Sequence, residues 1–572
     1  MRSIGFNQEE VDLHQHLIMK RRLCSSKASS RAKAKASGLK VKIKVKRLNR
    51  LCKEENNEEL VARIYPSMNK LFQRCCSASL LFHSTAGLLA LAILQFFLDH
   101  GDLLLHDSDP SLRAFLRSCL TRQFSDPAVA AATIDFLNQN KTRLLVSYTS
   151  VLPQFFPLLL KVIAWGDERL DDSFLLLLPA LVAPSSFLPI FPALLDLPIL
   201  VLALESLEQR SRSVPSSNSA TGLKNPEPEA LLALMDEAYT GTSIADNGGD
   251  FGDEDPKREA DALFLDLLKD ENEGLAEKHW SHPGMTTALQ SAMGSVQSEK
   301  LKHALKLAPS LLQVYFDIAL RDVNDSLLCA LLPIVFIRVD AIFPEKAFTL
   351  EIHKKCIEFV LAAFQQSPHF IAVLKKPIMD RIGQPHTSSA KAELASQLCW
   401  AVGEHGGGGA SQKDAARELF ETLELVLYEN LSSSQMPRSR DQKMTHEGAL
   451  AGRSAQARLL CFVVTAIAKL STCHRELSPR ARVCLAKVAR SCRFLDKTVW
   501  RRAQDYLSLM QEPIICLSIL GPSHGDDYCP GTIQWCGGGT KAVANIPFYL
   551  LGEQKGLPFH DFSLSDIIGN KK

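Results

Sequence analysis

Residues 151–205 constrain the fold more than any other part of this 572-residue chain, because they are almost wholly apolar yet repeatedly interrupted. The interruptions are prolines: Pro153, Pro157, Pro179, Pro184, Pro189, Pro192 and Pro198. A membrane-spanning helix needs about 20 consecutive apolar residues, and the pieces between these prolines are shorter. Short helices that are apolar on more than one face are typical of stacked helical repeats, whose neighbours cover both sides. We therefore expect the prolines to mark helix boundaries.

A helical pattern continues through most of the chain. Apolar residues recur at helical spacing in three further places: Leu311, Val314, Tyr315 and Ile318; Phe420, Leu423, Leu427 and Leu431; Leu460, Val463, Val464 and Ile467. Such spacing is the signature of an amphipathic helix, and no fixed repeat period accompanies it. The sequence predicts an all-α fold, an irregular α-solenoid of stacked helical hairpins of the HEAT-like or armadillo-like kind.

Composition divides the chain into five segments. They are a basic, disordered segment at 1–57, a first helical part at 58–209, a linker rich in Ser, Pro, Gly and acids at 210–258, a second helical part at 259–512, and a loop-rich tail at 513–572. The linker is expected to hold one short helix near residues 229–238. In the tail, residues 514–520 (IICLSIL) have the composition of a strand.

Local signals place several helix ends and core residues. Ser478 followed by Pro479 predicts a helix start with the serine as N-cap, and the glycines at 406–409 predict a helix end. We interpret Trp165 and Trp400 as core aromatics. Cysteines inside the apolar helical pattern are expected to be buried reduced thiols in a cytosolic protein: Cys329, Cys356, Cys399, Cys461 and Cys484.

Residues 20–53 are densely basic and contain no acid. Such a segment cannot bury enough surface to fold alone, so a solvated lead-in is expected. Nuclear targeting, binding to anionic lipid and an organellar transit role are the functional alternatives. The formal net charge of +2 argues against attraction of the whole chain to nucleic acid or membrane. Acidic residues among the first twelve leave no apolar core for a secretory signal.

Residues 78–98 are the best candidate for a membrane span by length. His83, Ser84, Thr85 and Gln95 interrupt this run, and few basic residues flank it. We therefore interpret it as a buried helix.

Several short motifs resemble sites of chemistry without completing one. Residues 521–525 (GPSHG) match the G-x-S-x-G nucleophile elbow, and residues 405–409 (HGGGG) resemble an oxyanion-hole loop. The serine, however, is followed by a turn where the elbow requires a helix. Residues 536–541 (CGGGTK) lack the residue order of a phosphate-binding loop.

Metal-binding pairs are equally incomplete. His14 with His16, Cys473 with His474, and Cys529 with Cys536 have no second pair at zinc spacing. We assign no catalytic, cofactor-binding or metal-binding residue, and we expect a protein that is not an enzyme and has no cofactor.

Long collinear segments resemble one known family. They are residues 155–165 (FFPLLLKVIAW), 174–182, 192–205, 394–405 (LASQLCWAVGEH), 418–431, 460–471, 477–488 and 502–513. In this order and spacing they are similar to the zeta subunits of the fifth adaptor-protein complex, over about residues 112–520. The chain resembles a plant-like or divergent member.

The resemblance implies a non-enzymatic large subunit with an α-solenoid trunk, joined to beta, mu and sigma subunits in a heterotetrameric coat. It also implies spatacsin-like and spastizin-like partners, and a cytoplasmic protein held peripherally on late endosomes and lysosomes, from which it retrieves cargo without requiring clathrin. No small-molecule substrate is expected. Two departures are expected. The basic segment replaces most of the family's upstream region, and the Gly-rich end after Gly521 lacks a counterpart.

The basic segment motivates an alternative from another class. In that hypothesis the chain is a nuclear or nucleic-acid-associated helical scaffold, such as a DNA-repair factor, with a nuclear pool. Binding of nucleic acid through residues 20–53 would weaken steeply as salt rises from about 50 to 200 mM.

Overall fold

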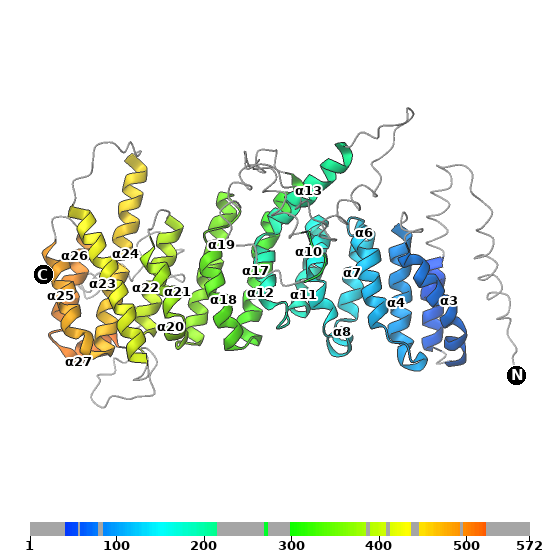
Figure 1. Cartoon of the computed structure of the whole chain (residues 1–572), viewed down its shortest axis with the longest axis horizontal. Helices are drawn as coiled ribbons and strands as arrows, with labels where there is room; N and C mark the ends of the chain where they lie inside the picture. The colour runs from blue at the N-terminus through cyan, green and yellow to red at the C-terminus, as the bar shows by residue number, and fades with distance from the viewer. Residues whose placement is uncertain are drawn as a thin grey trace, which may run out of the picture. The chain divides into compact units, whose positions relative to one another are not determined.

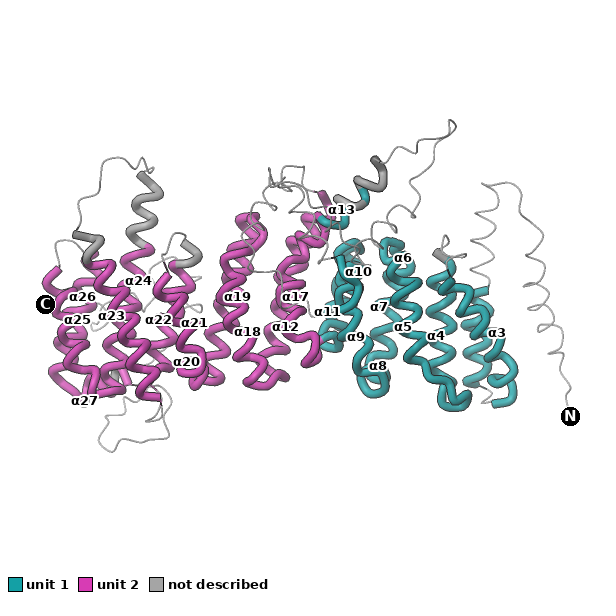
Figure 2. The backbone as a smooth tube through the Cα atoms, in the orientation of Figure 1, with its two compact units in different colours: residues 1–181, 203–249, 265–273 teal, residues 182–202, 250–264, 274–572 magenta. Residues whose placement is uncertain are grey.

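The computed structural model describes residues 41–54, 58–77, 84–213, 268–272, 298–384, 389–407, 412–435, 446–491 and 496–521. Within these ranges every regular element is a helix, and within each of the two units described below successive helices lie side by side (Figure 1). The fold is an all-α solenoid, as predicted. The chain forms two compact units, unit 1 with residues 1–181, 203–249 and 265–273, and unit 2 with residues 182–202, 250–264 and 274–572 (Figure 2).

Unit 1 is built on the apolar helix α4 (Ser84–Leu104), which packs against α3 (Glu58–Cys76), the π-helix η3 (Phe115–Leu120) and α7 (Pro127–Gln139). Phe72 and Phe97 meet there edge to face, with ring centroids 5.6 Å apart. The remaining elements are a helix at 41–54, α5 (Asp109–Ala114), α6 (Thr121–Gln123), α8 (Lys141–Ser147), α9 (Val151–Gln154), α10 (Phe156–Trp165), the 3₁₀ turn η4 (Glu168–Leu170) and α11 (Asp171–Leu181).

Unit 2 begins with α12 (Phe187–Leu195), which packs against α17 (Glu299–Asp322) and α18 (Asp325–Arg338). Tyr315 of α17 is buried there and donates a hydrogen bond to the Phe187 carbonyl at 2.9 Å. The later elements are α19 (Lys346–Gln366), α20 (Phe370–Val373), α21 (Lys375–Gly383), α22 (Ser389–His405), α23 (Lys413–Gln435), α24 (His446–Cys473), η6 (Arg475–Leu477), α25 (Ser478–Arg490), α26 (Lys497–Leu509) and α27 (Pro513–Leu520). Helix α13 (Leu197–Ser213) is divided between the units at Ala203.

The stretch at 151–205 is buried on more than one face, as its apolar excess predicts. Every residue of α10 before Trp165 is buried. The prediction that all its prolines mark helix boundaries is wrong for Pro179 and Pro192, which lie inside α11 and α12. An internal proline costs one backbone hydrogen bond and crowds the preceding turn, and here the burial of neighbours such as Phe191 and Leu194 offsets that cost.

Some helices are long and apolar enough to cross a membrane by length and composition alone. Two single helices meet these criteria, Thr85–Leu104 and Ala455–Cys473. A third candidate is the pair Phe187–Leu195 and Leu197–Glu205, if these two helices, bent by 65° relative to each other, are counted as one span. Within the fold, 67% and 78% of the apolar windows of the first two are buried. Packing inside the helical units therefore accounts for their apolar character.

Two segments predicted to lack helix are helical. Residues 41–54 form a helix within the predicted disordered segment, because Val45, Asn49 and Cys52 share one face that is buried on unit 1. Residues 514–520 are not a strand: they form α27, which begins at Pro513 and packs against α24 and α26. Both helices depend on neighbours that local composition does not reveal.

Of the two predicted helix boundaries, the end before the glycines at 406–409 is confirmed, and the start at Ser478 is shifted by one residue. Helix α22 ends at His405, immediately before the glycines. Helix α25 has Leu477 as its N-cap and Ser478 as its first residue, because η6 runs directly into it and leaves Ser478 with helical dihedrals. Helix α13 also continues past the predicted end at 209. The other segment boundaries stay predictions, and the expected helix at 229–238 lies outside the described residues.

Core predictions are mostly confirmed. Trp400 is buried, whereas Trp165 is only half-buried because it is the last residue of α10. Cys356, Cys399, Cys461 and Cys484 are buried free thiols, and Cys329 is half-buried. All three sets of helical spacing face the core, with Val314 half-buried at the edge.

Candidate functional site

The most elaborate polar site of unit 1 holds a segment that returns from far along the chain. We call residues 268–272 (Leu-Lys-Asp-Glu-Asn) the docked segment. It lies against η3, α9 and α10, whose residues are more than 100 positions earlier. Leu268, Asp270 and Glu271 are buried in this position. A short non-helical peptide is thus buried against a helical unit, and we call the surface of η3, α9 and α10 that it covers the groove.

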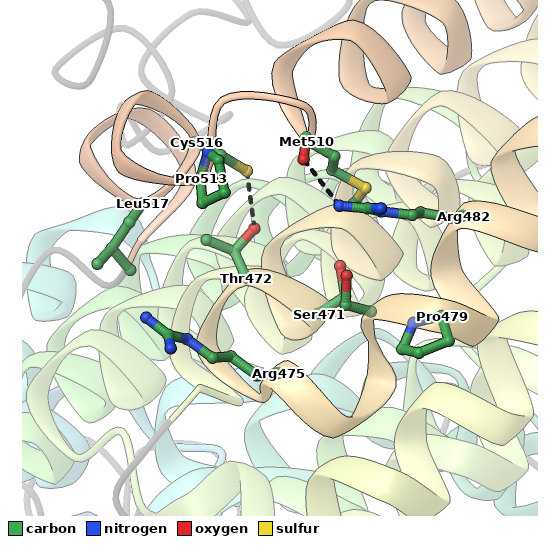
Figure 3. Close-up of a pocket in the computed structure, with 10 residues that line it drawn as sticks. Ser471, Thr472, Arg475, Pro479, Arg482, Met510, Pro513, Cys516 and Leu517 are labelled. Atoms are coloured by element: carbon green, nitrogen blue, oxygen red, sulfur yellow. Dashed lines mark hydrogen bonds between the residues drawn. The ribbon is translucent and has the colours of Figure 1, made fainter.

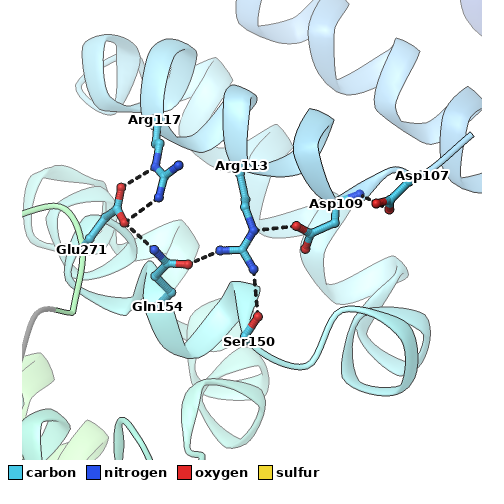
Figure 4. A network of polar contacts seen from close by, with 7 residues as sticks. All are labelled: Asp107, Asp109, Arg113, Arg117, Ser150, Gln154 and Glu271. Carbon is cyan, nitrogen blue, oxygen red and sulfur yellow. Dashed lines mark hydrogen bonds and ion pairs between the residues drawn. The ribbon is translucent and has the colours of Figure 1, made fainter.

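Glu271 accepts hydrogen bonds from two side chains of unit 1. Arg117 of η3 approaches its carboxylate with two nitrogens, Nε at 2.5 Å and Nη2 at 2.9 Å (Figure 4). Gln154 of α9 donates from Nε2 to the same carboxylate. The Arg117 guanidinium also lies over the Phe155 ring, 5.6 Å from its centroid. Two-pronged contact of this kind between arginine and carboxylate is strong and directional.

A second arginine holds Gln154 in place. Arg113 of α5 donates from Nη1 to Gln154 Oε1, from Nη2 to Ser150 Oγ at 2.8 Å, and from Nε to Asp109 Oδ2 at 2.6 Å (Figure 4). The Asp109 amide in turn donates to Asp107 at 2.9 Å. The groove is therefore lined by a chain of polar contacts that fixes its own side chains.

Lys161 forms the deepest contact of the site. Its side chain is fully buried in the middle of α10 and lies 2.7 Å from the Asp270 carboxylate, which is also buried. The ammonium donates to the Leu268 carbonyl as well. Burial lowers the pKa of Lys161, and the Asp270 carboxylate opposes that shift. A lone charge in this position is strongly unfavourable, so the buried ammonium needs an anionic partner, which Asp270 supplies.

Unit 2 has a separate surface pocket of about 620 Å³ near its C-terminal helices (Figure 3). Its lining includes Arg475, Arg482, Thr472 and Cys516. Arg482 donates to the Met510 carbonyl at 2.9 Å, and Thr472 Oγ1 lies 3.3 Å from Cys516 Sγ. Burial raises the pKa of the Cys516 thiol, so the reactive thiolate is disfavoured. The two arginines suit an anion, and the described lining residues pair no nucleophile with a carboxylate or histidine base.

The short motifs from the sequence do not form a site in the part of the chain that the structure describes. Gly521 ends α27, and the rest of the 521–525 motif lies outside the described residues. His405 ends α22, and Gly408 and Gly409 lie outside. Also outside are residues 536–541, His14, His16, Cys529 and Cys536. No group of three metal-ligating side chains occurs among the described residues.

Sequence reasoning missed the docked segment. One signal was available, since Lys161 is the single charge in the apolar run at 155–165 and needs an acidic partner if the run is buried. Its partner, 109 positions away, follows a linker and carries no distinguishing pattern of its own.

Comparison with known proteins gives two family matches. Residues 39–161 match a model described as AP-5 complex subunit, vesicle trafficking, and residues 258–528 match one described as AP-5 complex subunit zeta-1, C-terminal TPR repeats. The chain belongs to the AP-5 zeta family. These matches extend beyond residues 112–520, the range over which the sequence resemblance was predicted. The first match begins inside the basic segment, so that segment does not replace the family's region from residue 39 onward. The second match extends past Gly521.

Curated relatives agree with this membership. The chain is 24% identical to mouse AP-5 complex subunit zeta-1 over 447 residues, which is 75% of this chain and 50% of the relative. It is 25% identical to the human protein of the same name over 449 residues, 76% of this chain and 50% of the relative. The chain spans about half the length of these relatives. No solved structure gives a significant match.

Proposed function

We propose that this chain is a non-enzymatic large subunit of a heterotetrameric adaptor-protein coat that acts in vesicle-mediated protein transport. The observation that carries the proposal is the pair of AP-5 family matches, which together include the first and the last of the described helices. Stacked helices present extended surfaces to partner proteins, so the fold suits a scaffold. In this function the chain needs neither a cofactor nor a small-molecule substrate.

The proposed partners are the beta, mu and sigma subunits of the same complex, together with spatacsin-like and spastizin-like proteins. The proposed location is the cytoplasmic face of late endosomes and lysosomes, with peripheral attachment through these partners. Burial of the long apolar helices inside the units supports peripheral attachment, since their apolar surface is already covered by protein.

Affinity purification tests the proposal. The tagged full chain, expressed in its own cell type, should recover beta-type, mu-type and sigma-type adaptor subunits in near-equal amounts by quantitative mass spectrometry. The matched control is a chain that lacks residues 20–40, which removes basic sequence but leaves the helix at 41–54 on unit 1. It should recover the same partners. Recovery of either chain as a monomer without adaptor subunits would contradict the proposal.

A further inference from the structure

The docked segment contacts unit 1 through its main chain and through buried side chains, as a bound peptide contacts a receptor. Main-chain hydrogen bonds hold both ends, with Lys161 donating to the Leu268 carbonyl and the Asn272 amide donating to the Gln154 carbonyl at 2.7 Å. Between these ends Asp270 and Glu271 are buried, whereas Lys269 is half-buried. Main-chain bonds for affinity and pockets for selected side chains are the means by which short peptides are recognised.

The receptor side of the groove is cationic and selects acids at two adjacent positions. Lys161 has no exposed surface, so an occupant must supply an anion where Asp270 lies. Arg117 presents its two-pronged donor set where Glu271 lies. Removing one member of a buried ion pair costs far more than the pair itself contributes. An empty groove is therefore disfavoured, whereas exchange of one acidic peptide for another preserves both ion pairs.

The receptor side is also held in place without the docked segment. Arg117 rests on the Phe155 ring, and Gln154 is held by Arg113, which Ser150 and Asp109 hold in turn. All these contacts lie within residues 107–155. A groove whose side chains are already positioned loses little entropy when a peptide binds.

We propose that this groove of unit 1 is a recognition site for short acidic peptides with the pattern Leu-x-Asp-Glu-Asn, and that residues 268–272 occupy it as an exchangeable internal ligand. The partner is a protein segment with the same pattern of one apolar residue followed by adjacent acids. Because tethering gives the internal ligand an effective concentration on the order of millimolar, the partner peptide binds well only after the docked segment is displaced. The proposal is independent of the proposed function, since every contact lies within unit 1.

A labelled synthetic peptide tests the exchange. The probe is residues 264–275 of this chain (FLDLLKDENEGL), and the protein is the full chain. Glu271→Arg places two arginines together and should release the docked segment. Fluorescence anisotropy should show the probe binding at least tenfold more tightly to this variant than to the wild type. Adding Arg117→Glu should abolish binding of the probe.

Matched controls separate recognition from general charge. Arg143 is a half-buried arginine of unit 1 that pairs with Asp102 and not with the docked segment, so Glu271→Arg with Arg143→Glu should bind the probe as Glu271→Arg does. A probe with Asn and Gln in place of Asp270 and Glu271 should not bind. Equal binding of the acidic and neutral probes would overturn the proposal.

A purely structural role of the docked segment is the competing explanation. Asn272→Pro removes the main-chain donor to the Gln154 carbonyl and no buried charge, so it should weaken docking even if Glu271→Arg fails to fold. If unit 1 stays folded by circular dichroism and neither variant gains affinity for the probe, the proposal is wrong. If both variants unfold together with loss of helical signal, the segment is a fixed part of the core and the proposal is also wrong.

Discussion

At the scale of residues, buried ion pairs are the polar features that organise the core. Arg338 of α18 places Nη2 2.6 and 2.7 Å from the two Asp196 oxygens, and both side chains are almost fully buried. Glu404 and Lys469 form a comparable pair between α22 and α24. Burial raises the pKa of Asp196 to about 6, and the Arg338 guanidinium opposes that shift. Each charge is therefore tolerated only because its partner is present.

Breaking the Arg338–Asp196 pair on one side should destabilise unit 2. Arg338→Met leaves the Asp196 carboxylate buried without its partner, and we expect a loss of about 3–5 kcal/mol in the free energy of unfolding, measured with denaturant. Adding Asp196→Leu should restore most of it, because an apolar pair replaces the ions. Lys302→Met breaks an exposed pair with Glu299 and should change stability by less than about 0.5 kcal/mol. Equal losses in the single and double variants would contradict the explanation.

The pairing of these residues shows a limit of sequence reasoning. Asp196 is visible in the sequence as a charge inside an apolar run, as Lys161 is, and such a charge predicts that some partner exists. Its identity depends on contacts between residues 142 positions apart, which no local pattern encodes. The candidate site likewise depends on contacts between residues that are far apart in the sequence, so it could be described only from the structure.

At the scale of elements, the existence of most helices follows from the spacing of apolar residues, as at Phe420 and Leu427. Their ends and exceptions depend on neighbours. Pro179 is tolerated inside α11, and residues 41–54 become helical against α4, where Asn49 donates to Asp99 at 2.7 Å. Packing energy from neighbouring helices exceeds local propensity in both cases, which is why sequence patterns alone misplaced them.

The contact between α22 and α24 depends on a glycine. A Cβ atom on Gly403 would lie 2.9 Å from the Ala466 Cα, which is backbone and cannot rotate away. Gly403→Val should therefore push the helices apart and cost about 1–3 kcal/mol. Gly383→Ala in α21 is the matched control, since its Cβ would meet nothing within 4 Å. The control should be neutral or stabilising in thermal unfolding, and a similar loss in both variants would rule out close packing as the cause.

At the scale of the whole molecule, the fold class and family membership were predictable because they rest on features spread along the chain. Apolar helical spacing recurs from α4 to α26, and the family resemblance combines many collinear segments. The contact of residues 268–272 with unit 1, by contrast, occurs once in the chain, and no recurring sequence pattern accompanies it. Sequence reasoning is therefore strong for the repeating part of this molecule and weak for the one segment that departs from it.

Both units contain histidines that burial keeps neutral. Burial lowers the pKa of His100 and His106 in unit 1 and of His353 in unit 2, against the opposing effects of Asp99, Asp107 and Asp340. In the unfolded chain these groups titrate near 6.5. As pH falls through 6.5 the unfolded chain takes up protons first, so the stability contributed by the neutral histidines is present above that pH and lost below it.

We therefore expect the free energy of unfolding of the full chain to be lower at pH 5.5 than at pH 7.5, measured by urea denaturation at constant ionic strength. Replacing His100, His106 and His353 by Gln should flatten this dependence, because the groups that distinguish the two states are gone. His369→Gln, at a half-exposed side chain beside Asp325, is the matched control and should keep the slope of the wild type. An unchanged slope in the triple variant would show that other groups cause the acid sensitivity.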